Sequence, residues 1–211
     1  MDTYKETFIT WNTIAKFYQD KFMDLDIYND TYQILVESIP KKKAKVLEIG
    51  CGPGNISKYL LTQNPQLKLK GIDVSENMIQ LAKKNNPIAE FEIMDGRKIH
   101  LLKDSFDAIV CGFCIPYFSN KDCIKLINDC NNLLNNSGIL YLSFVEGDPS
   151  NSGFISGSSG ARTYFYYHQL KSLKKVLKNY SFKIIDIFHK NYKKPNNINE
   201  IHTIIILKKV N

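Results

Sequence analysis

A glycine-rich turn and a more distant acidic residue are the features of this sequence best suited to chemistry. Val46–Ile56 reads VLEIGCGPGNI, an apolar run followed by glycines at alternate positions and the start of a helical stretch. Glycine lets the backbone turn tightly and approach a ligand closely, because no Cβ intervenes. The next predicted strand ends at Asp73, where a carboxylate can accept both hydroxyls of an adenosine ribose. The sequence therefore predicts a ligand that carries adenosine beside this turn.

Two other groups of residues are placed to contact a second ligand. Cys114–Tyr117 (CIPY) follows a predicted strand, and Tyr164–His168 (YFYYH) follows a segment rich in Gly and Ser. His168 can act as a general base because the ordinary pKa of histidine is near neutrality, and a surface or capping role is the alternative. The neighbouring tyrosines suit an aromatic substrate or a cation cage, and equally simple packing. Glu146 and Asp148 are candidate pocket acids. No role is assigned to the remaining histidines, His100, His189 and His202.

The elements that must position these residues alternate between strand and helix. Apolar and β-branched runs predict strands at Lys45–Ile49, Lys68–Asp73, Glu90–Ile93, Asp107–Cys111, Ile139–Phe144, Phe182–Phe188 and Ile201–Leu207. Helices are expected between them at Asn55–Leu61, Ser75–Asn85, Lys121–Leu134 and Tyr167–Asn179. This alternation predicts an α/β fold with a Rossmann-like, doubly wound, mostly parallel seven-stranded sheet. Only a turn at 193–199 joins the last two strands, so we expect an antiparallel pair there, with an antiparallel edge strand.

The first 40 residues are expected to form an N-terminal helical cap on a domain that spans 41–211. Apolar residues between Tyr4 and Leu25 recur at spacings of three and four, which places them on one helical face. A second helix is expected from Asp30 to Ile39, where a proline follows.

The segment Gly147–Gly160 (GDPSNSGFISGSSG) differs in composition from the rest of the chain. Its glycines and serines suit a flexible linker. Its position after a predicted parallel strand suits a mobile lid instead, because such loops overhang the ligand crevice. Both interpretations predict a mobile loop at 147–160.

Five successive motifs resemble those of class I S-adenosylmethionine-dependent methyltransferases. They are, in order, Val46–Ile56, Gly71–Ser75, Met94–Gly96, Phe106–Val110 and Ser137–Leu142. Their order and intervals match that superfamily from about Lys45 to Phe144. The chain is similar in particular to small bacterial methyltransferase-domain proteins with a helical N-terminal cap. The resemblance implies S-adenosyl-L-methionine as the cofactor.

The resemblance also implies which residues would bind that cofactor. Glu48 matches an acidic position near the methionine amino group, and Asp73 matches the residue that holds the ribose. The positions that would pass close to the methionine part are Gly50, Cys51, Gly52, Gly54 and, after the fourth predicted strand, Cys111.

Other residues would surround the adenine or cover the cofactor. Asp95 and Gly96 match the position that meets the adenine amino group and ring. Val74 and Met78 follow the ribose-binding aspartate, and Met78 can pack on the adenine, although a helical Met is also a common core residue. The residues that can close over the cofactor are Trp11 and Tyr18, for which a core stripe at helical spacing is the alternative.

Methyl transfer is an in-line displacement, and it needs a base only when the nucleophile carries a proton. Amino-methyltransferases of nucleic acids carry Asn or Asp, then Pro-Pro and an aromatic residue, at the position of Cys114–Tyr117. Cysteine is a poor acceptor for an exocyclic amine, so that chemistry is disfavoured. A small-molecule acceptor is the favoured partner. His168 and Tyr117 are the candidate catalytic residues, and Tyr117 is alternatively part of the pocket wall.

Three alternatives stay open from the sequence. The first is an RNA or protein methyltransferase, which the net charge of +7 favours and the absence of an appended nucleic-acid module disfavours. The second is a non-catalytic protein that binds S-adenosylmethionine, because fold does not determine function. The third is a nicotinamide dehydrogenase, which Asn55 disfavours because GxGxxG requires glycine there.

Composition indicates an ordinary globular protein of 211 residues, 44% of them hydrophobic. No stretch approaches the ~18 consecutive apolar residues of a membrane span. The N-terminus carries acidic residues and lacks an apolar signal region, so a cytoplasmic location is expected, with no membrane partner. The five cysteines are expected as free thiols, and their spacing predicts no metal site. Either a monomer or a homodimer is compatible with the sequence.

Overall fold

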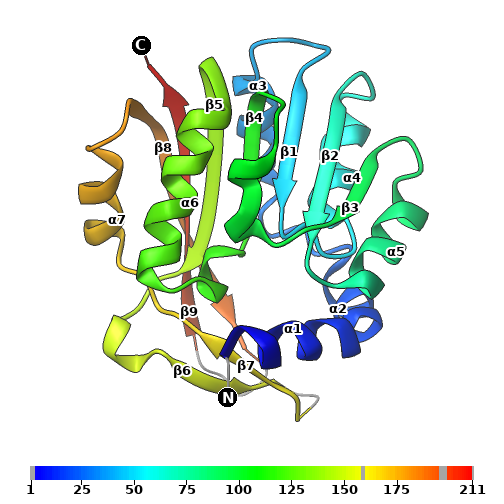
Figure 1. The fold of residues 1–211 in the computed structure, drawn as a ribbon, viewed down its shortest axis with the longest axis vertical. Helices are drawn as coiled ribbons and strands as arrows, with labels where there is room; N and C mark the ends of the chain where they lie inside the picture. Colours follow the sequence, from blue (N-terminus) through cyan, green and yellow to red (C-terminus); the bar gives the residue numbers. More distant parts are fainter. Residues whose placement is uncertain (1–2, 158–159, 195–198, 211) are drawn as a thin grey trace.

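Short runs of β-branched and aliphatic residues form one central seven-stranded sheet, in the order β3-β2-β1-β4-β5-β9-β8 (Figure 1). The computed structural model describes residues 3–157, 160–194 and 199–210. The strands are β1 (Lys45–Ile49), β2 (Lys68–Asp73), β3 (Glu90–Ile93), β4 (Phe106–Cys111), β5 (Leu134–Val145), β8 (Phe182–Lys193) and β9 (Asn199–Lys209). Neighbours from β3 to β5 pair in parallel, and β9 runs antiparallel to both β5 and β8. The predicted α/β fold with an antiparallel pair closing one edge is therefore confirmed.

Helices cover both faces of this sheet. The helices that follow the cap are α3 (Asn29–Ser38), α4 (Asn55–Gln63), α5 (Glu76–Asn85), α6 (Asn120–Leu133) and α7 (Leu170–Leu177), with 3-10 turns η1 (Gly96–Leu101), η2 (Ile115–Tyr117) and η3 (Pro149–Asn151). Serine side chains begin two of them: Ser75 accepts from the Met78 amide, and Ser119 accepts from the Asp122 amide. Buried residues of α3, α4 and α5 pack on one face, and those of α6 and α7 pack on the other.

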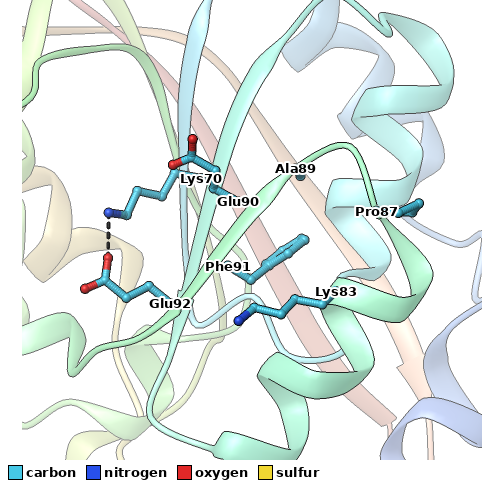
Figure 2. Close-up of a pocket in the computed structure, with 7 residues that line it drawn as sticks. All are labelled: Lys70, Lys83, Pro87, Ala89, Glu90, Phe91 and Glu92. Carbon is cyan, nitrogen blue, oxygen red and sulfur yellow. Dashed lines mark ion pairs between the residues drawn. The ribbon is translucent and has the colours of Figure 1, made fainter.

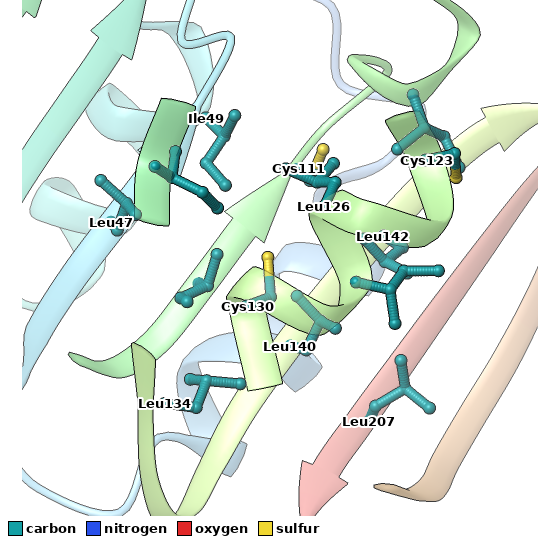
Figure 3. Packing of buried hydrophobic residues seen from close by; sticks show 14 of the residues in the cluster. Leu47, Ile49, Cys111, Cys123, Leu126, Cys130, Leu134, Leu140, Leu142 and Leu207 are labelled. Carbon is teal, nitrogen blue, oxygen red and sulfur yellow. The ribbon is translucent and has the colours of Figure 1, made fainter. Parts of the chain in front are cut away.

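The core between α6 and the sheet is apolar, so polar residues that could contact a ligand are found at the ends of the strands. Figure 3 shows Cys123, Leu126 and Cys130 of α6 against Cys111 of β4 and apolar residues of β5. These cysteines are buried and free, and they pack as small apolar side chains. Strands that are apolar on both faces offer a ligand only the edge where they end.

The N-terminal cap consists of α1 (Thr3–Thr13) and α2 (Ala15–Phe22), which are separated at Ile14. Figure 1 places both helices at the end of the sheet toward which β1 and β2 point. The polar side of α1 makes the contacts that hold it there, because Asn12 Oδ1 accepts from Ser75 Oγ and the Asn77 amide, both at 3.0 Å. The cap helices are thereby docked on the start of α5.

The segment expected as an irregular loop at 147–160 contains regular structure. It forms η3 and strand β6 (Gly153–Ser156), which pairs with β7 (Arg162–Phe165) as an antiparallel hairpin. Residues 166–169 after β7 are not helical, so α7 begins at Leu170 and not at Tyr167 as expected. Residues 158 and 159 of this segment, and 195–198 of the predicted turn before β9, lie outside the described residues. The mobility of the segment stays a prediction.

Within the described ranges, the structure has no helix with the length and apolar character needed to cross a membrane.

Candidate functional site

A cavity of about 640 Å³ lies at the carboxyl ends of the parallel strands and is also lined by residues of α1, α2 and the β6–β7 hairpin. The predicted apolar stripe of the cap does not form a core. Its large side chains line this cavity instead, and they are Tyr4, Phe8, Trp11, Tyr18, Phe22 and Leu25. Carboxyl ends of parallel strands are the usual place for a ligand in a doubly wound sheet.

The floor of the cavity is the glycine turn that follows β1. Gly50 and Gly52 have φ of 66° and 52°, a left-handed conformation that favours glycine. A Cβ on Gly50 would lie 2.8 Å from Cys114 Sγ, whereas one on Gly52 would meet only Tyr18, at 3.7 Å. The backbone of Gly52 is therefore open toward the cavity, as the sequence predicted for a turn that approaches a ligand. Cys51 and Val74 also line the cavity.

Asp73, at the end of β2, faces this turn. One carboxylate oxygen accepts from the Gly52 amide and the other from the Ser75 amide, each at 2.9 Å. Burial raises the pKa of Asp73. A carboxylate can accept about four hydrogen bonds, so lone pairs remain for a ligand. The geometry fits a group that presents adjacent hydroxyls, such as a ribose.

Glu48 supplies a second acidic group near the turn. Its side chain is 1% exposed, lines the cavity, and accepts a hydrogen bond from Ser57 Oγ. Burial raises the pKa of Glu48 to about 8, and the charge of Asp73 adds to the increase. A cationic group bound beside Glu48 would favour its ionised form.

Asp95 and Gly96 line the cavity beyond Asp73, and Met78 lies nearby on α5. Asp95 is already engaged, because Arg97 donates to its carboxylate through the backbone amide at 2.9 Å and through Nε at 2.9 and 3.0 Å. The Arg97 guanidinium in turn lies 3.8 Å from the ring centroid of Tyr4. This arrangement connects the predicted adenine position to the cap.

Aromatic side chains cover the glycine turn. The Trp11 ring lies 5.4 Å from Tyr18 and 5.2 Å from Tyr117, both edge to face. Trp11 Nε1 is buried and has no hydrogen-bond partner among the described residues. An indole N–H is a donor only, so this atom needs an acceptor from a ligand. The structure thus brings Trp11, Tyr18 and Tyr117 together, and their roles toward a ligand stay predictions.

Three predicted site residues, Gly54, Cys111 and His168, do not line the cavity. Gly54 has φ of 81° and begins α4, where a Cβ would lie 2.4 Å from Asn86 Nδ2, so its role is to pack that helix. Cys111 is still within β4, where strand alternation directs it into the α6 core. The cavity begins one residue later, at Gly112–Cys114.

His168, the predicted general base, is buried and lies outside the cavity lining, where it connects two segments of the backbone. It is 5% exposed and bonded through Nε2 to the Ile115 carbonyl at 2.9 Å. Burial lowers its pKa, and no part of it lines the cavity. The ring fixes η2 against the segment after β7. Asp148 bonds locally to Ser150, and Glu146 bonds to the Leu170 amide, so neither suits a pocket acid.

The structure also brings together residues that the sequence analysis missed. Tyr28, Tyr192, Glu200 and His202 line the inner end of the cavity. Glu200 and His202 occupy alternate positions on β9, which is a signal for one shared face. Tyr28 lies far away in sequence, so no local pattern could have found it.

A second hollow of about 550 Å³ lies at the outer edge of the sheet, around β3 (Figure 2). Two of its charged side chains are paired with each other, since Lys70 Nζ lies 2.6 Å from Glu92 Oε2. It includes neither the glycine turn nor Asp73, so the first cavity is the candidate active site.

Comparison with known proteins agrees with this geometry. Residues 46–138 match the family model described as a methyltransferase domain. The chain is 28% identical to a putative methyltransferase of Invertebrate iridescent virus 6 over 140 residues. This alignment covers 66% of this chain and 50% of that protein. It is 27% identical to the demethylmenaquinone methyltransferase of Thermotoga maritima over 135 residues. This alignment covers 64% of this chain and 56% of that protein. The chain thus spans about half the length of these curated relatives.

A solved structure shares the fold along nearly the whole chain. The magnesium protoporphyrin IX methyltransferase of Synechocystis, crystallised with bound S-adenosylmethionine, superposes with a TM-score of 0.70 at 16% identity. The match covers 99% of this chain and 98% of that one. At this identity the likeness concerns the fold.

Proposed function

We propose that the chain is a class I S-adenosylmethionine-dependent methyltransferase that transfers a methyl group from S-adenosyl-L-methionine to a small-molecule acceptor, and the match of residues 46–138 to a methyltransferase domain supports this proposal. One observation carries the proposal. The open glycine turn at Gly52 and the half-buried carboxylate of Asp73 form one hydrogen-bonded unit on the cavity floor. That unit has the shape and the polarity to hold an adenosine-bearing cofactor.

The residues present fit this cofactor at each of its ends. Asp73 would accept the ribose hydroxyls, and Glu48 would face the methionine amino group. The unpartnered Trp11 Nε1 would donate to a carboxylate or another acceptor of the bound molecule. Asp95 and Gly96 would border the adenine. Each of these residues lines the cavity, and the unpartnered indole nitrogen in particular calls for a ligand.

When bound, S-adenosylmethionine supplies an electrophilic methyl group on a sulfonium. The chain contributes orientation and exclusion of water. Tyr18 and Tyr117 present aromatic rings near the glycine turn, and aromatic faces stabilise a cation through their quadrupoles. The cap and the β6–β7 hairpin keep bulk water from the space between donor and acceptor.

The small-molecule acceptor is supported by the shape of the site. A cavity of about 640 Å³ is within the usual range for small ligands and is covered by the cap and the hairpin. A polymer would need an open groove at this place. The demethylmenaquinone and magnesium protoporphyrin methyltransferases are named for small acceptors, which agrees with this proposal.

Calorimetric titration tests the cofactor assignment. S-adenosylmethionine and S-adenosylhomocysteine should bind the purified protein with micromolar Kd, and NAD should not. Asp73→Ala and Asp73→Asn should each weaken binding at least about 10-fold, because hydrogen bonds to a charged group contribute about 1.5–3 kcal/mol. Asp104→Ala is the matched control, since Asp104 is an exposed carboxylate paired with Lys45 away from the cavity. Equal binding of NAD, or no binding at all, would refute the proposal.

A further inference from the structure

A cluster of polar side chains lines the cavity beside β9, and the proposed cofactor binding does not involve these side chains. His202 lies on β9 opposite Val145, the last residue of β5, and therefore at the carboxyl edge of the sheet. Tyr28, Glu200 and His202 all line the cavity there. Polar groups at such a depth are costly to bury unless they have partners or a ligand.

Polar contacts connect these three side chains in the order Tyr28, His202, Glu200. The Tyr28 hydroxyl lies 2.6 Å from His202 Nδ1, and the pair is buried. His202 Nε2 lies 3.6 Å from Glu200 Oε2, and it has no hydrogen-bond partner in the part of the chain that the structure describes. The other oxygen of Glu200 forms an ion pair with Lys194. With its proton on Nε2, facing the carboxylate, the imidazole accepts the Tyr28 hydroxyl at Nδ1.

The imidazole is held in a fixed orientation. Tyr192 stacks on it with ring centroids 4.8 Å apart and an interplanar angle of 14°, and Phe113 lies 4.9 Å away on a tilted plane. Phe113 is itself constrained, because its φ is 52° and its amide donates to Ser143 Oγ at 2.9 Å. Strain of this kind at a buried residue persists when the surroundings determine it, and it is frequent at functional sites.

Phe113 also connects the cluster to the cofactor end of the cavity. It follows β4, which pairs with β1 immediately before the glycine turn, and its ring centroid is 5.0 Å from that of Tyr28. A ligand that contacts Tyr28 is therefore on the path between the glycine turn and β9. A purely structural Tyr–His bond would need neither the cavity nor an unpaired Nε2.

We propose that Tyr28 binds the hydroxyl of a phenol-class acceptor, and that His202 and Glu200 make Tyr28 the group that receives the acceptor proton. This inference rests on the proposed methyltransferase function. The aromatic rings of Tyr28, Phe113 and Tyr192 line this part of the cavity, and aromatic side chains of this kind can pack against an aromatic acceptor. The Tyr28 hydroxyl can accept the hydrogen bond of an acceptor O–H while it donates its own proton to His202, so it is suited to relay a proton.

The step balances without any further reagent. The acceptor oxygen forms a bond to the methyl carbon as the S–CH₃ bond breaks, and the electron pair of that bond stays on sulfur. The acceptor proton passes to the Tyr28 oxygen while the Tyr28 proton passes to His202 Nδ1. The products are an aryl methyl ether, S-adenosylhomocysteine and an imidazolium that faces Glu200. Burial raises the pKa of Tyr28, which keeps its proton available for the bond to His202.

The test is a comparison of ligands that differ only at the hydroxyl. We would titrate the protein with 2-naphthol, naphthalene and 2-methoxynaphthalene, with and without saturating S-adenosylhomocysteine. The wild type should bind 2-naphthol at least about 10-fold more tightly than both analogues, because a site built to pair a hydroxyl rejects ligands that lack the donor. Tyr28→Phe and His202→Phe should reduce that preference to within about threefold, and Glu200→Gln should reduce it partly.

Matched controls separate this role from general packing. Tyr59→Phe removes a hydroxyl that bonds to Gln33 at 3.3 Å, and His189→Phe removes an imidazole that bonds to Thr203 at 3.1 Å. Both should keep the full preference. Wild-type protein that does not distinguish the three ligands, or Tyr28→Phe protein that still does, would overturn the inference. Failure of S-adenosylhomocysteine to bind would instead count against the proposed function, and the titrations without it would still decide the subsite.

Discussion

At the scale of single residues, buried carboxylates determine the electrostatic character of the cavity. Glu48 is buried and Asp73 is half-buried near the glycine turn, and desolvation raises the pKa of each. Without a cationic ligand, ionisation of both groups is unfavourable because each charge is desolvated and near the other. The site is therefore suited to a bound molecule that carries positive charge.

This electrostatic arrangement predicts a particular pH dependence of folding stability. The folded-state pKa of Glu48, about 8, is above its ordinary value of 4.5, so the folded chain binds the proton more tightly. Stability without ligand should therefore fall as pH rises between these values, by up to about 1.4 kcal/mol per pH unit. Urea unfolding from about pH 5 to pH 8 measures it. Glu48→Gln should flatten the profile, and a wild-type profile that rises over this range would contradict the assignment.

A second prediction concerns the unpartnered indole nitrogen. Trp11 is the one tryptophan of the chain, so its fluorescence reports directly on the cavity. Binding of S-adenosylhomocysteine should change that emission. Trp11→Phe should weaken calorimetric binding about 5- to 10-fold, because a hydrogen bond contributes about 1 kcal/mol or somewhat more. Unchanged affinity in the variant would place the ligand away from this atom.

The residues that the sequence identified are those whose role depends on local spacing. Gly50, Gly52 and Asp73 belong to a strand, a turn and the next strand end, so their proximity follows from one βαβ unit. The hydrogen bond between Tyr28 and His202 joins residues 174 positions apart. It depends on how the last strand returns into the sheet, which no local pattern records. His168 was misassigned because its partner, the Ile115 carbonyl, is also remote in sequence, 53 positions away.

At the scale of elements, α1 and the β6–β7 hairpin form one cover. Thr10 Oγ1 donates to the Arg162 carbonyl at 2.7 Å, and Thr7 Oγ1 accepts from the Tyr164 amide at 3.0 Å. Arg162 also forms an ion pair with Glu6. The hairpin is therefore attached to the cap more than to the sheet.

These contacts predict that the cover opens as a unit. Thr7→Val combined with Thr10→Val should accelerate amide hydrogen exchange in the hairpin, because each lost bond removes about 1 kcal/mol of local stability. Affinity for S-adenosylhomocysteine should fall a few-fold. Thr13→Val is the control on the same helix, since Thr13 Oγ1 only donates to the Ile9 carbonyl. Equal exchange in the double variant and the control would contradict the shared cover.

Elements were predictable where composition and periodicity agree. The bounds of β1, β2 and β3 match the sequence analysis because apolar runs end sharply at turn residues. Strand β6 was missed because its pairing with β7, and the attachment of the hairpin to α1, are tertiary contacts that override a Gly/Ser-rich composition. The break at Ile14 was hidden by a helical periodicity that continues across it.

At the scale of the whole molecule, the sheet order explains why the cavity extends from the glycine turn to β9. The parallel strands from β3 to β5 end at the side of the glycine turn, and β9 enters between β5 and β8 from the opposite direction. Its first residues therefore lie beside the last residues of β5. The sequence predicted this antiparallel pair, but not that its starting end would supply side chains to the cavity.

Binding should stabilise the molecule as a whole. A ligand at about 100 times its Kd adds about 2.7 kcal/mol to the free energy of unfolding. For a chain of 211 residues this should raise Tm by roughly 5–10 °C. Differential scanning fluorimetry with S-adenosylhomocysteine measures the shift, with NAD as the comparison. Asp73→Ala should lose most of it, and an equal shift with NAD would contradict the cofactor assignment.

A crystal structure of the protein with S-adenosylhomocysteine tests the central claim most directly. We predict the ribose hydroxyls on Asp73, the amino group beside Glu48 and an acceptor atom of the ligand within hydrogen-bond distance of Trp11 Nε1. The sulfur should then point along the cavity toward Phe113 and Tyr28. A ligand bound in the hollow around β3, or one in the main cavity without contact to Asp73, would contradict the account.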